Sequence, residues 1–132
     1  NLEYFKIKNY VIKNKNALDI KGRFDYVVTD LPYGLNSNVY LKSSERTLKE
    51  RSNRINLKNA KTSQIQNIEK FYMQFLKRIK NSIKAAVIIF PSFVNYKSII
   101  KRAGFGVEKE MSVYVHRSLT RKITRIRPNW FC

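Results

Sequence analysis

Asp30 is the residue of this sequence best suited to chemistry, because of what precedes and follows it. It ends the apolar strand predicted over Phe24–Thr29 and is followed by Leu-Pro-Tyr-Gly. In an open α/β sheet, ligands bind beyond the carboxyl ends of the strands. Pro32 stiffens the turn, and Tyr33 offers a rigid aromatic face for a planar ring whose amine donates to Asp30. A turn-capping aspartate beside a core tyrosine explains the same residues equally well.

The stretch Asp25–Gly34, DYVVTDLPYG, resembles the (Asn/Asp/Ser)-Pro-Pro-(Tyr/Phe) motif of methyltransferases that act on amino groups. The glycine after the tyrosine, Gly34, resembles the THUMP-associated tRNA guanine-N2 methyltransferases. The segment Val115–Ile123 also resembles the closing hairpin of that family. The resemblance covers about residues 10–127, and Leu31 departs from it because the family usually has proline there.

The resemblance implies a catalytic set of four residues around the target amine. Asp30 and the backbone carbonyl of Leu31 would hold the two hydrogens of a guanine N2 amine. They would favour the positive charge that develops as this nitrogen attacks the methyl group of S-adenosyl-L-methionine. Asp30 would then take the proton, Pro32 would fix the turn, and Tyr33 would stack on the extruded base. No metal is expected, since the chain has one histidine and one cysteine.

The resemblance also implies where the cofactor binds. Lys15–Asp19 resembles the turn that contacts the adenine, so Asn16 and Ala17, together with Asp30, are the expected cofactor contacts. The family's Gly-rich turn after the first strand has no counterpart among the four glycines of this sequence. The first residue is also asparagine rather than methionine. We therefore expect a divided enzyme whose second polypeptide supplies that turn, the first two strands and a THUMP region.

The missing strands predict an open sheet. In the methyltransferase sheet the strand order is 3-2-1-4-5-7-6, so the absent first and second strands lie between the third and the fourth. The strand predicted at Phe24–Thr29 would then expose an apolar edge. Unpaired backbone at such an edge invites pairing with another chain.

A strong positive charge indicates a polyanionic partner. The 132 residues include 27 lysines and arginines against nine acidic residues, a formal charge of +18. No apolar run approaches the roughly 20 residues that span a bilayer, so we expect no membrane. The resemblance implies that the polyanionic partner is tRNA. A solvated basic surface and a structural histidine are the plainer interpretations. The expected RNA contacts lie in the central loop and the hairpin: Lys42, Arg46, Arg51, Arg54, His116, Arg117, Arg121 and Lys122.

The elements that must position these residues alternate between strands and helices. Apolar runs predict five strands, at residues 10–15, 24–29, 85–90, 105–116 and 123–127. Helical spacing from Ile65 to Ile83 predicts a long helix, and a shorter helix over Asn95–Ala103 ends at Gly104. Leu35–Lys61 predicts a loop with a helical stretch, and Arg117–Lys122 a turn. The predicted fold is α/β, an incomplete Rossmann-like class I methyltransferase sheet, mostly parallel with a C-terminal antiparallel hairpin.

Three hypotheses remain open for the chain, which is predicted to form one incomplete domain over residues 1–132. The first is the catalytic subunit of a split tRNA guanine-N2 methyltransferase in the cytoplasm, since a single cysteine fits a reducing compartment. The second is a non-catalytic, basic RNA-binding module. The third is a fragment of an adenine-N6 DNA methyltransferase, because the tetrapeptide alone does not fix the base. The closing hairpin favours tRNA.

Overall fold

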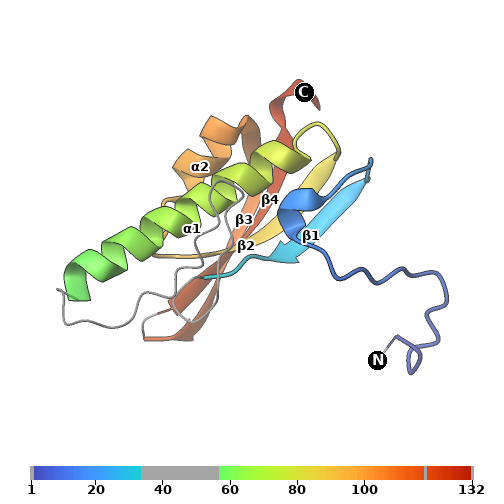
Figure 1. Ribbon diagram of the computed structural model, residues 1–132, viewed down its shortest axis with the longest axis horizontal. Coiled ribbons are helices and arrows are strands. Elements are labelled where there is room, and N and C mark those ends of the chain that lie inside the picture. The colour runs from blue at the N-terminus through green and yellow to red at the C-terminus, as the bar shows by residue number, and fades with distance from the viewer. Residues whose placement is uncertain (1, 34–56, 118, 132) are drawn as a thin grey trace.

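A four-stranded sheet carries two α-helices in the computed structural model, which describes residues 2–33, 57–117 and 119–131 (Figure 1). Two short 3-10 helices lie before the first strand and after the last. The elements in chain order are η1 (Ala17–Asp19), β1 (Tyr26–Asp30), α1 (Leu57–Ile79), β2 (Ala85–Pro91), α2 (Tyr96–Ala103), β3 (Phe105–His116), β4 (Leu119–Pro128) and η2 (Asn129–Phe131). The α/β prediction is therefore confirmed.

The sheet is mixed, with the order β1-β2-β4-β3. β1 and β2 pair in parallel with Val28 opposite Val87, while β4 runs antiparallel to both of its neighbours. The prediction of a mostly parallel sheet is wrong for the described strands, since only one of their pairs is parallel. The reason is the short connection between β3 and β4, which permits only antiparallel pairing. β4 lies between β3 and β2 and runs opposite to both, so its pairing with β2 is antiparallel as well.

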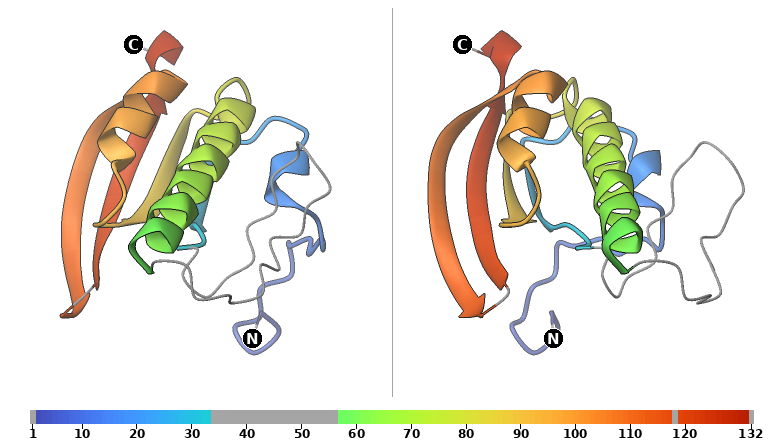
Figure 2. Two further views of the ribbon diagram at one scale, coloured as in Figure 1. Left: turned by 60° about the vertical axis from the view of Figure 1, so that its left-hand side comes forward. Right: turned by 90° about the vertical axis from the view of Figure 1, so that its left-hand side faces the viewer.

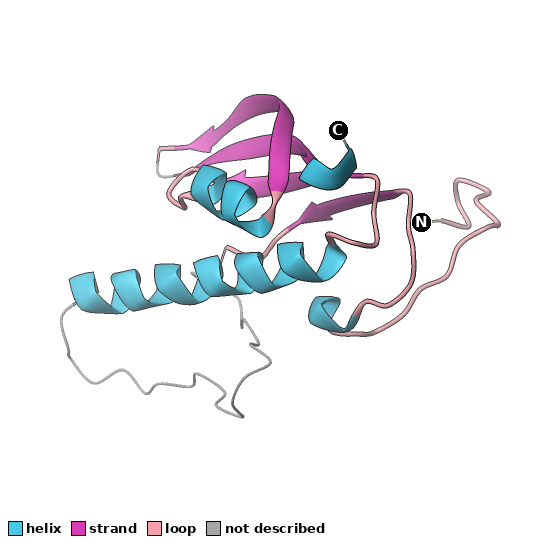
Figure 3. Cartoon of the chain, turned by 90° about the horizontal axis from the view of Figure 1, so that it is seen from above, coloured by secondary structure: helices cyan, strands magenta, loops and turns pink. Residues whose placement is uncertain are grey.

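Both helices cover the same face of the sheet (Figures 2 and 3). The predicted long helix is confirmed, because its apolar side chains at three- and four-residue spacing are buried. It ends at Ile79 rather than Ile83, and Ile83 enters the core from the turn that follows. No helix in the described parts of the chain is long and apolar enough to cross a membrane. The buried residues of α1 are Ile68, Phe71, Tyr72, Phe75, Leu76 and Ile79.

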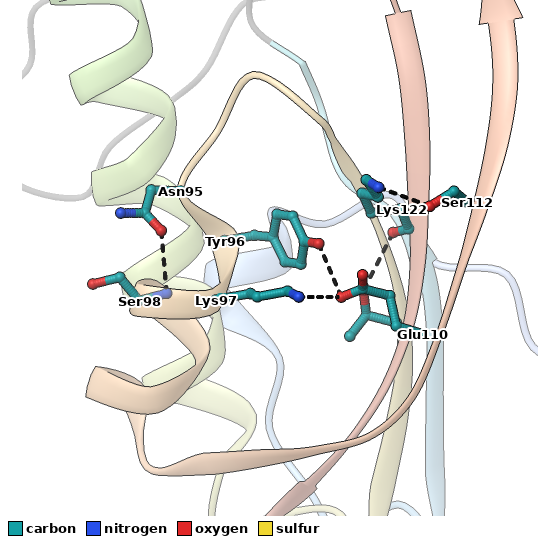
Figure 4. A network of polar contacts seen from close by, with 8 residues as sticks. Asn95, Tyr96, Lys97, Ser98, Glu110, Ser112 and Lys122 are labelled. Carbon is teal, nitrogen blue, oxygen red and sulfur yellow. Dashed lines mark hydrogen bonds and ion pairs between the residues drawn. The ribbon is translucent and has the colours of Figure 1, made fainter.

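Polar contacts fix α2 to β3 (Figure 4). The Tyr96 hydroxyl donates to Glu110 Oε2 at 2.9 Å, and Lys97 Nζ lies 3.4 Å from the same oxygen. The hydrogen bond from Tyr96 is the main cause that lowers the pKa of Glu110. Asn95 caps the start of α2 through its side-chain oxygen. Gly104 ends the helix as predicted, with a φ of 84° that favours glycine.

The opposite face of the sheet carries no described helix (Figure 2). Alternation along β1 puts Tyr26, Val28 and Asp30 on this face, and Val28 is 78% exposed. Among the described strands, β1 has β2 as its only neighbour. The described helices therefore cover this strand on one face, and one of its edges has no partner among the described strands.

The prediction of a strand at Tyr10–Lys15 is wrong. The described residues 7–16 form no strand, and Val11 is 80% exposed. A strand needs a neighbour that satisfies its backbone hydrogen bonds, and none of the described strands pairs with this segment. The other predicted elements differ mainly at their ends: β1 starts at Tyr26, α1 at Leu57 and β4 at Leu119, which shortens the predicted turn.

Candidate active site

Asp30 lies where the sequence predicts it, at the carboxyl end of β1. Its backbone is opposite Ile89, close to the end of the parallel neighbour β2. The alternation along β1 directs its side chain to the face of the sheet that carries no described helix. The Asp30 side chain is 44% exposed, so a ligand can reach the carboxylate.

Tyr33 turns back onto this carboxylate. Its hydroxyl donates to Asp30 Oδ1 at 2.7 Å. Burial, followed by this hydrogen bond and the negative charge of Asp30, raises the pKa of Tyr33 to about 12. Tyr33 is therefore a neutral phenol at physiological pH and acts as a hydrogen-bond donor to Asp30.

Arg121 of β4 is the third member of the cluster. Its Nη1 lies 3.8 Å from Asp30 Oδ2, and its guanidinium carbon lies 5.6 Å from the centre of the Tyr33 ring. The register explains its position, because Arg121 is opposite Pro91 at the carboxyl end of β2. Arg121 Nε is buried and has no hydrogen-bond partner among the described residues. The Arg121 guanidinium therefore lies near both the Asp30 carboxylate and the Tyr33 ring, and its Nε–H donates to none of the described residues.

The turn between Asp30 and Tyr33 is held from the core. Leu31 is buried at 4% exposure, and the Tyr72 hydroxyl donates to the Pro32 carbonyl at 2.8 Å. Tyr72 belongs to α1 and packs edge-on against Phe90 of β2. Burial is the main cause that raises the pKa of Tyr72, so its hydroxyl stays a donor. The Asp-Leu-Pro-Tyr turn is thus attached to the helix and the sheet at the same time.

Asn16 and Ala17 lie at the start of η1. The Asn16 side-chain oxygen accepts a hydrogen bond from the Leu18 backbone N–H at 2.9 Å and so caps the short helix. Leu18 is buried in the core, and Ala17 packs against it. An amide oxygen has two lone pairs, so the expected contact of Asn16 with an adenine amine remains a prediction that the cap does not exclude.

The described basic residues that were predicted to bind RNA do not all lie on one surface. His116 and Arg117 are exposed at the end of the β3–β4 hairpin. Arg121 and Lys122 are consecutive in β4 and therefore face opposite sides of the sheet. Arg121 lies beside Asp30, whereas Lys122 Nζ donates to Ser112 Oγ at 2.7 Å. The loop residues fall outside the described part of the chain: Lys42, Arg46, Arg51 and Arg54.

Sequence reasoning missed two contacts of the site. The sequence pattern predicts Tyr72 to be an ordinary core residue of an amphipathic helix. Its spacing does not indicate the hydrogen bond to the Pro32 carbonyl. Arg121 reads as a phosphate ligand, and its place beside Asp30 depends on β4 pairing with β2. That pairing between strands far apart in the sequence is the signal that would have found Arg121.

The cluster can bind and deprotonate an amine. The Asp30 carboxylate accepts hydrogen bonds and protons, Tyr33 provides an aromatic ring, and Arg121 holds a positive charge beside both. Because all three sit at the carboxyl end of a parallel strand pair, the position is one where α/β sheets bind ligands. The described residues contain no group of three or more metal-ligating side chains.

Comparisons with known proteins assign no family to the chain. A scan against protein-family models finds no match, and a search of curated proteins finds no significant match. Any function must therefore be argued from the residues and the geometry of the Asp30 cluster.

Proposed function

We propose that the chain is the catalytic part of a cytoplasmic, S-adenosylmethionine-dependent tRNA methyltransferase that modifies the N2 amine of a guanosine. A second polypeptide completes the enzyme. The observation that carries the proposal is the Asp30–Tyr33 pair, 2.7 Å apart, in an Asp-Leu-Pro-Tyr turn at the carboxyl end of β1.

The order of the strands supports the proposal. The sheet order β1-β2-β4-β3 agrees with the 4-5-7-6 part of the methyltransferase order, including the reversed last strand inside the sheet. In that comparison β1 corresponds to the fourth strand, whose missing neighbour is the first. The open edge of β1 is therefore the place for a strand from the partner.

The proposed reaction uses the residues of this chain as follows. Asp30 accepts one N–H of the guanine amine and the Leu31 carbonyl accepts the other, which raises the electron density on nitrogen. These two acceptors would orient the nitrogen for attack on the methyl group that S-adenosylmethionine would supply, its sulfur leaving as a neutral thioether. Asp30 then takes the proton from the methylated nitrogen. Tyr33 stacks on the base, and Tyr72 prevents the turn from moving.

The residues present fit one end of the cofactor. S-adenosylmethionine, when bound, supplies the electrophilic methyl group. Asn16 can accept from the adenine amine with the lone pair that the η1 cap leaves unused, and Ala17 lies next to it. The chain has no Gly-rich turn for the methionine end, so that part of the site is assigned to the partner.

The test is methyl transfer by the chain purified with its partner. We expect Asp30→Ala to lower turnover on unmodified tRNA by a hundredfold or more, about 3 kcal/mol for one transition-state acceptor. Binding of tRNA should be unchanged, because the developing charge exists only in the transition state. Asp25→Ala is the matched control, since Asp25 lies just before the same strand and pairs with Lys84 at the surface.

The modified nucleoside must also be identified after nuclease digestion. N2-methylguanosine from tRNA supports the substrate assignment, whereas N6-methyl-2′-deoxyadenosine from a parallel assay on DNA supports the DNA methyltransferase alternative. Near-full activity of Asp30→Ala would show that the site is wrongly assigned.

A non-catalytic RNA-binding module is the second candidate function. It is favoured by the fact that Asp30 already has two partners in the chain, Tyr33 and Arg121, which give the carboxylate a structural role. On this alternative the purified complex binds tRNA without transferring methyl groups. Asp30→Ala would then lower the unfolding midpoint and nothing else.

A further inference from the structure

A groove lies at the end of the sheet opposite to Asp30. It has a volume of about 560 Å³ and is lined by the segment that enters β1, the turn that enters β2, and Trp130 of η2. These parts lie together because β4 runs antiparallel and brings η2 back to the amino ends of β1 and β2 (Figure 1). The five residues of β1 separate the groove from Asp30 by about 13 Å along the strand.

Two aromatic side chains of the groove are only half buried. Phe24 is 44% exposed and Trp130 is 54% exposed, whereas the aromatic residues of the core are almost fully buried. Both line the same groove. The Trp130 indole N–H donates to the Lys80 carbonyl at 3.2 Å, which fixes the edge of the ring. The groove therefore presents aromatic surface that the fold holds in place without covering it.

The charged residues that line the groove are Arg23, Lys84 and Asp25, which together carry a net charge of +1. Arg23 is exposed, and Lys84 Nζ lies 2.6 Å from Asp25, the one acidic residue that lines the groove. Asn81 and Ser82 add polar atoms to the lining. With a chain charge of +18, the rim attracts polyanions. Aromatic faces between cations are the arrangement on which single-stranded nucleic acids bind, with bases stacked on the rings and phosphates near the cations.

We propose that this groove binds one base of single-stranded nucleic acid, stacked on Phe24 and Trp130 with the adjoining phosphate at Arg23. The site goes beyond the proposed methyltransferase activity, since it shares no residue with the Asp30 cluster. It gives the chain a second point of contact with a nucleic-acid strand. Asn81 and Ser82 supply hydrogen bonds to the edge of the base.

Trp130 provides a direct measurement because it is the only tryptophan of the chain. The protein, in the form in which it purifies, is titrated with a single-stranded RNA octamer and with the DNA octamer of the same sequence. We expect saturable quenching of the Trp130 fluorescence. The apparent affinity should fall steeply with salt, because bound cations release counterions from the phosphates. Equal quenching by both octamers indicates recognition of base and phosphate alone, while preference for RNA adds the 2′-hydroxyl.

Variants separate stacking at the groove from general attraction to the basic surface. Phe24→Ala should weaken octamer binding by about 5-fold to 150-fold, as measured by fluorescence anisotropy. Phe5→Ala is the matched control, because Phe5 is more exposed than Phe24 and does not line the groove. Arg23→Ala should weaken binding and flatten the salt dependence. Circular dichroism melting checks that each variant is folded.

The proposal is overturned if the octamers leave Trp130 fluorescence unchanged, or if Phe24→Ala and Phe5→Ala bind equally well. Asp30→Ala distinguishes this site from the proposed active site, since it should leave the quenching unaltered. Wild-type protein that transfers methyl groups but shows no quenching refutes only the groove. Wild-type protein that shows quenching but transfers no methyl groups refutes only the proposed activity.

Discussion

Asp30 carries two interactions within the chain before any substrate arrives. Oδ1 accepts from Tyr33 and Oδ2 faces Arg121. A carboxylate offers about four lone-pair sites, so an incoming amine can share an oxygen with either residue. The aromatic ring and the hydroxyl of Tyr33 therefore have separable effects, the ring on base binding and the hydroxyl on the orientation of Asp30.

Substitutions at Tyr33 test this separation. We expect Tyr33→Phe, which keeps the ring, to lower turnover by a few-fold. Tyr33→Ala should lower kcat/KM by more than tenfold, partly through KM, because stacking of about 1–3 kcal/mol per base exists before the chemical step. Steady-state kinetics on unmodified tRNA measure both variants. Equal losses in the two variants would mean that the hydroxyl, rather than the ring, is essential.

Alkaline pH should weaken the fold through the same residue. The folded-state pKa of Tyr33 is raised to about 12, above the unfolded value of about 10, so deprotonation favours the unfolded chain. Its stabilisation is complete below pH 10 and is lost as the pH rises towards 12. Urea unfolding at pH 9, 10 and 11 should show a smaller loss for Tyr33→Phe than for the wild type. Parallel losses would contradict the assignment.

The position of Asp30 could be predicted from the sequence because it depends on local information. An apolar run followed by Asp-Leu-Pro-Tyr ends a strand wherever that strand pairs. The positions of Tyr72 and Arg121 depend on how α1 and β4 pack against β1 and β2. Those contacts join residues far apart in the sequence, so neither spacing nor composition reports them.

At the scale of elements, α1 is the support of the turn. We expect Tyr72→Phe to lower the free energy of unfolding by about 1–2 kcal/mol, since the Pro32 carbonyl loses its donor. Methyl transfer should fall as well, because the turn loosens. Tyr96→Phe is the matched control, as it loses a hydroxyl bond of similar length to Glu110 at another place (Figure 4). Urea unfolding and the tRNA assay should show comparable stability losses and a loss of activity in Tyr72→Phe alone.

The elements themselves were predictable where sequence pattern and packing agree. β2 is apolar throughout and lies inside the sheet, and Gly104 ends α2 by a backbone conformation that glycine favours. The segment Tyr10–Lys15 has the composition of a strand without a described neighbour, and it forms none. Composition indicates how readily a segment adopts a β-strand, but the strand forms only where a neighbouring strand is available to pair with it.

At the scale of the whole molecule, the sheet face that carries no described helix predicts self-association. Val28 is largely exposed on β1, and an apolar groove of about 330 Å³ lies beside it between β1 and β2. We expect the isolated chain to form oligomers in analytical ultracentrifugation, and Val28→Lys to reduce them. Val11→Lys, at an equally exposed valine outside the sheet, should have no effect. A monomeric chain that melts cooperatively on its own would contradict the divided-enzyme interpretation.

The place of β4 also constrains how the chain is made. β4 is the last of the four described strands to leave the ribosome, yet it lies between β2 and β3. Until it emerges, β3 has no described strand to pair with, and β2 has only β1 beside it. Domains that fold during synthesis usually gain structure from the N-terminal side. In this chain the four-stranded sheet can form only after translation has passed Pro128. A ribosome that stalls before β4 therefore leaves a nascent chain in which β2 and β3 lack the strand that lies between them. Its apolar surface is then accessible to chaperones.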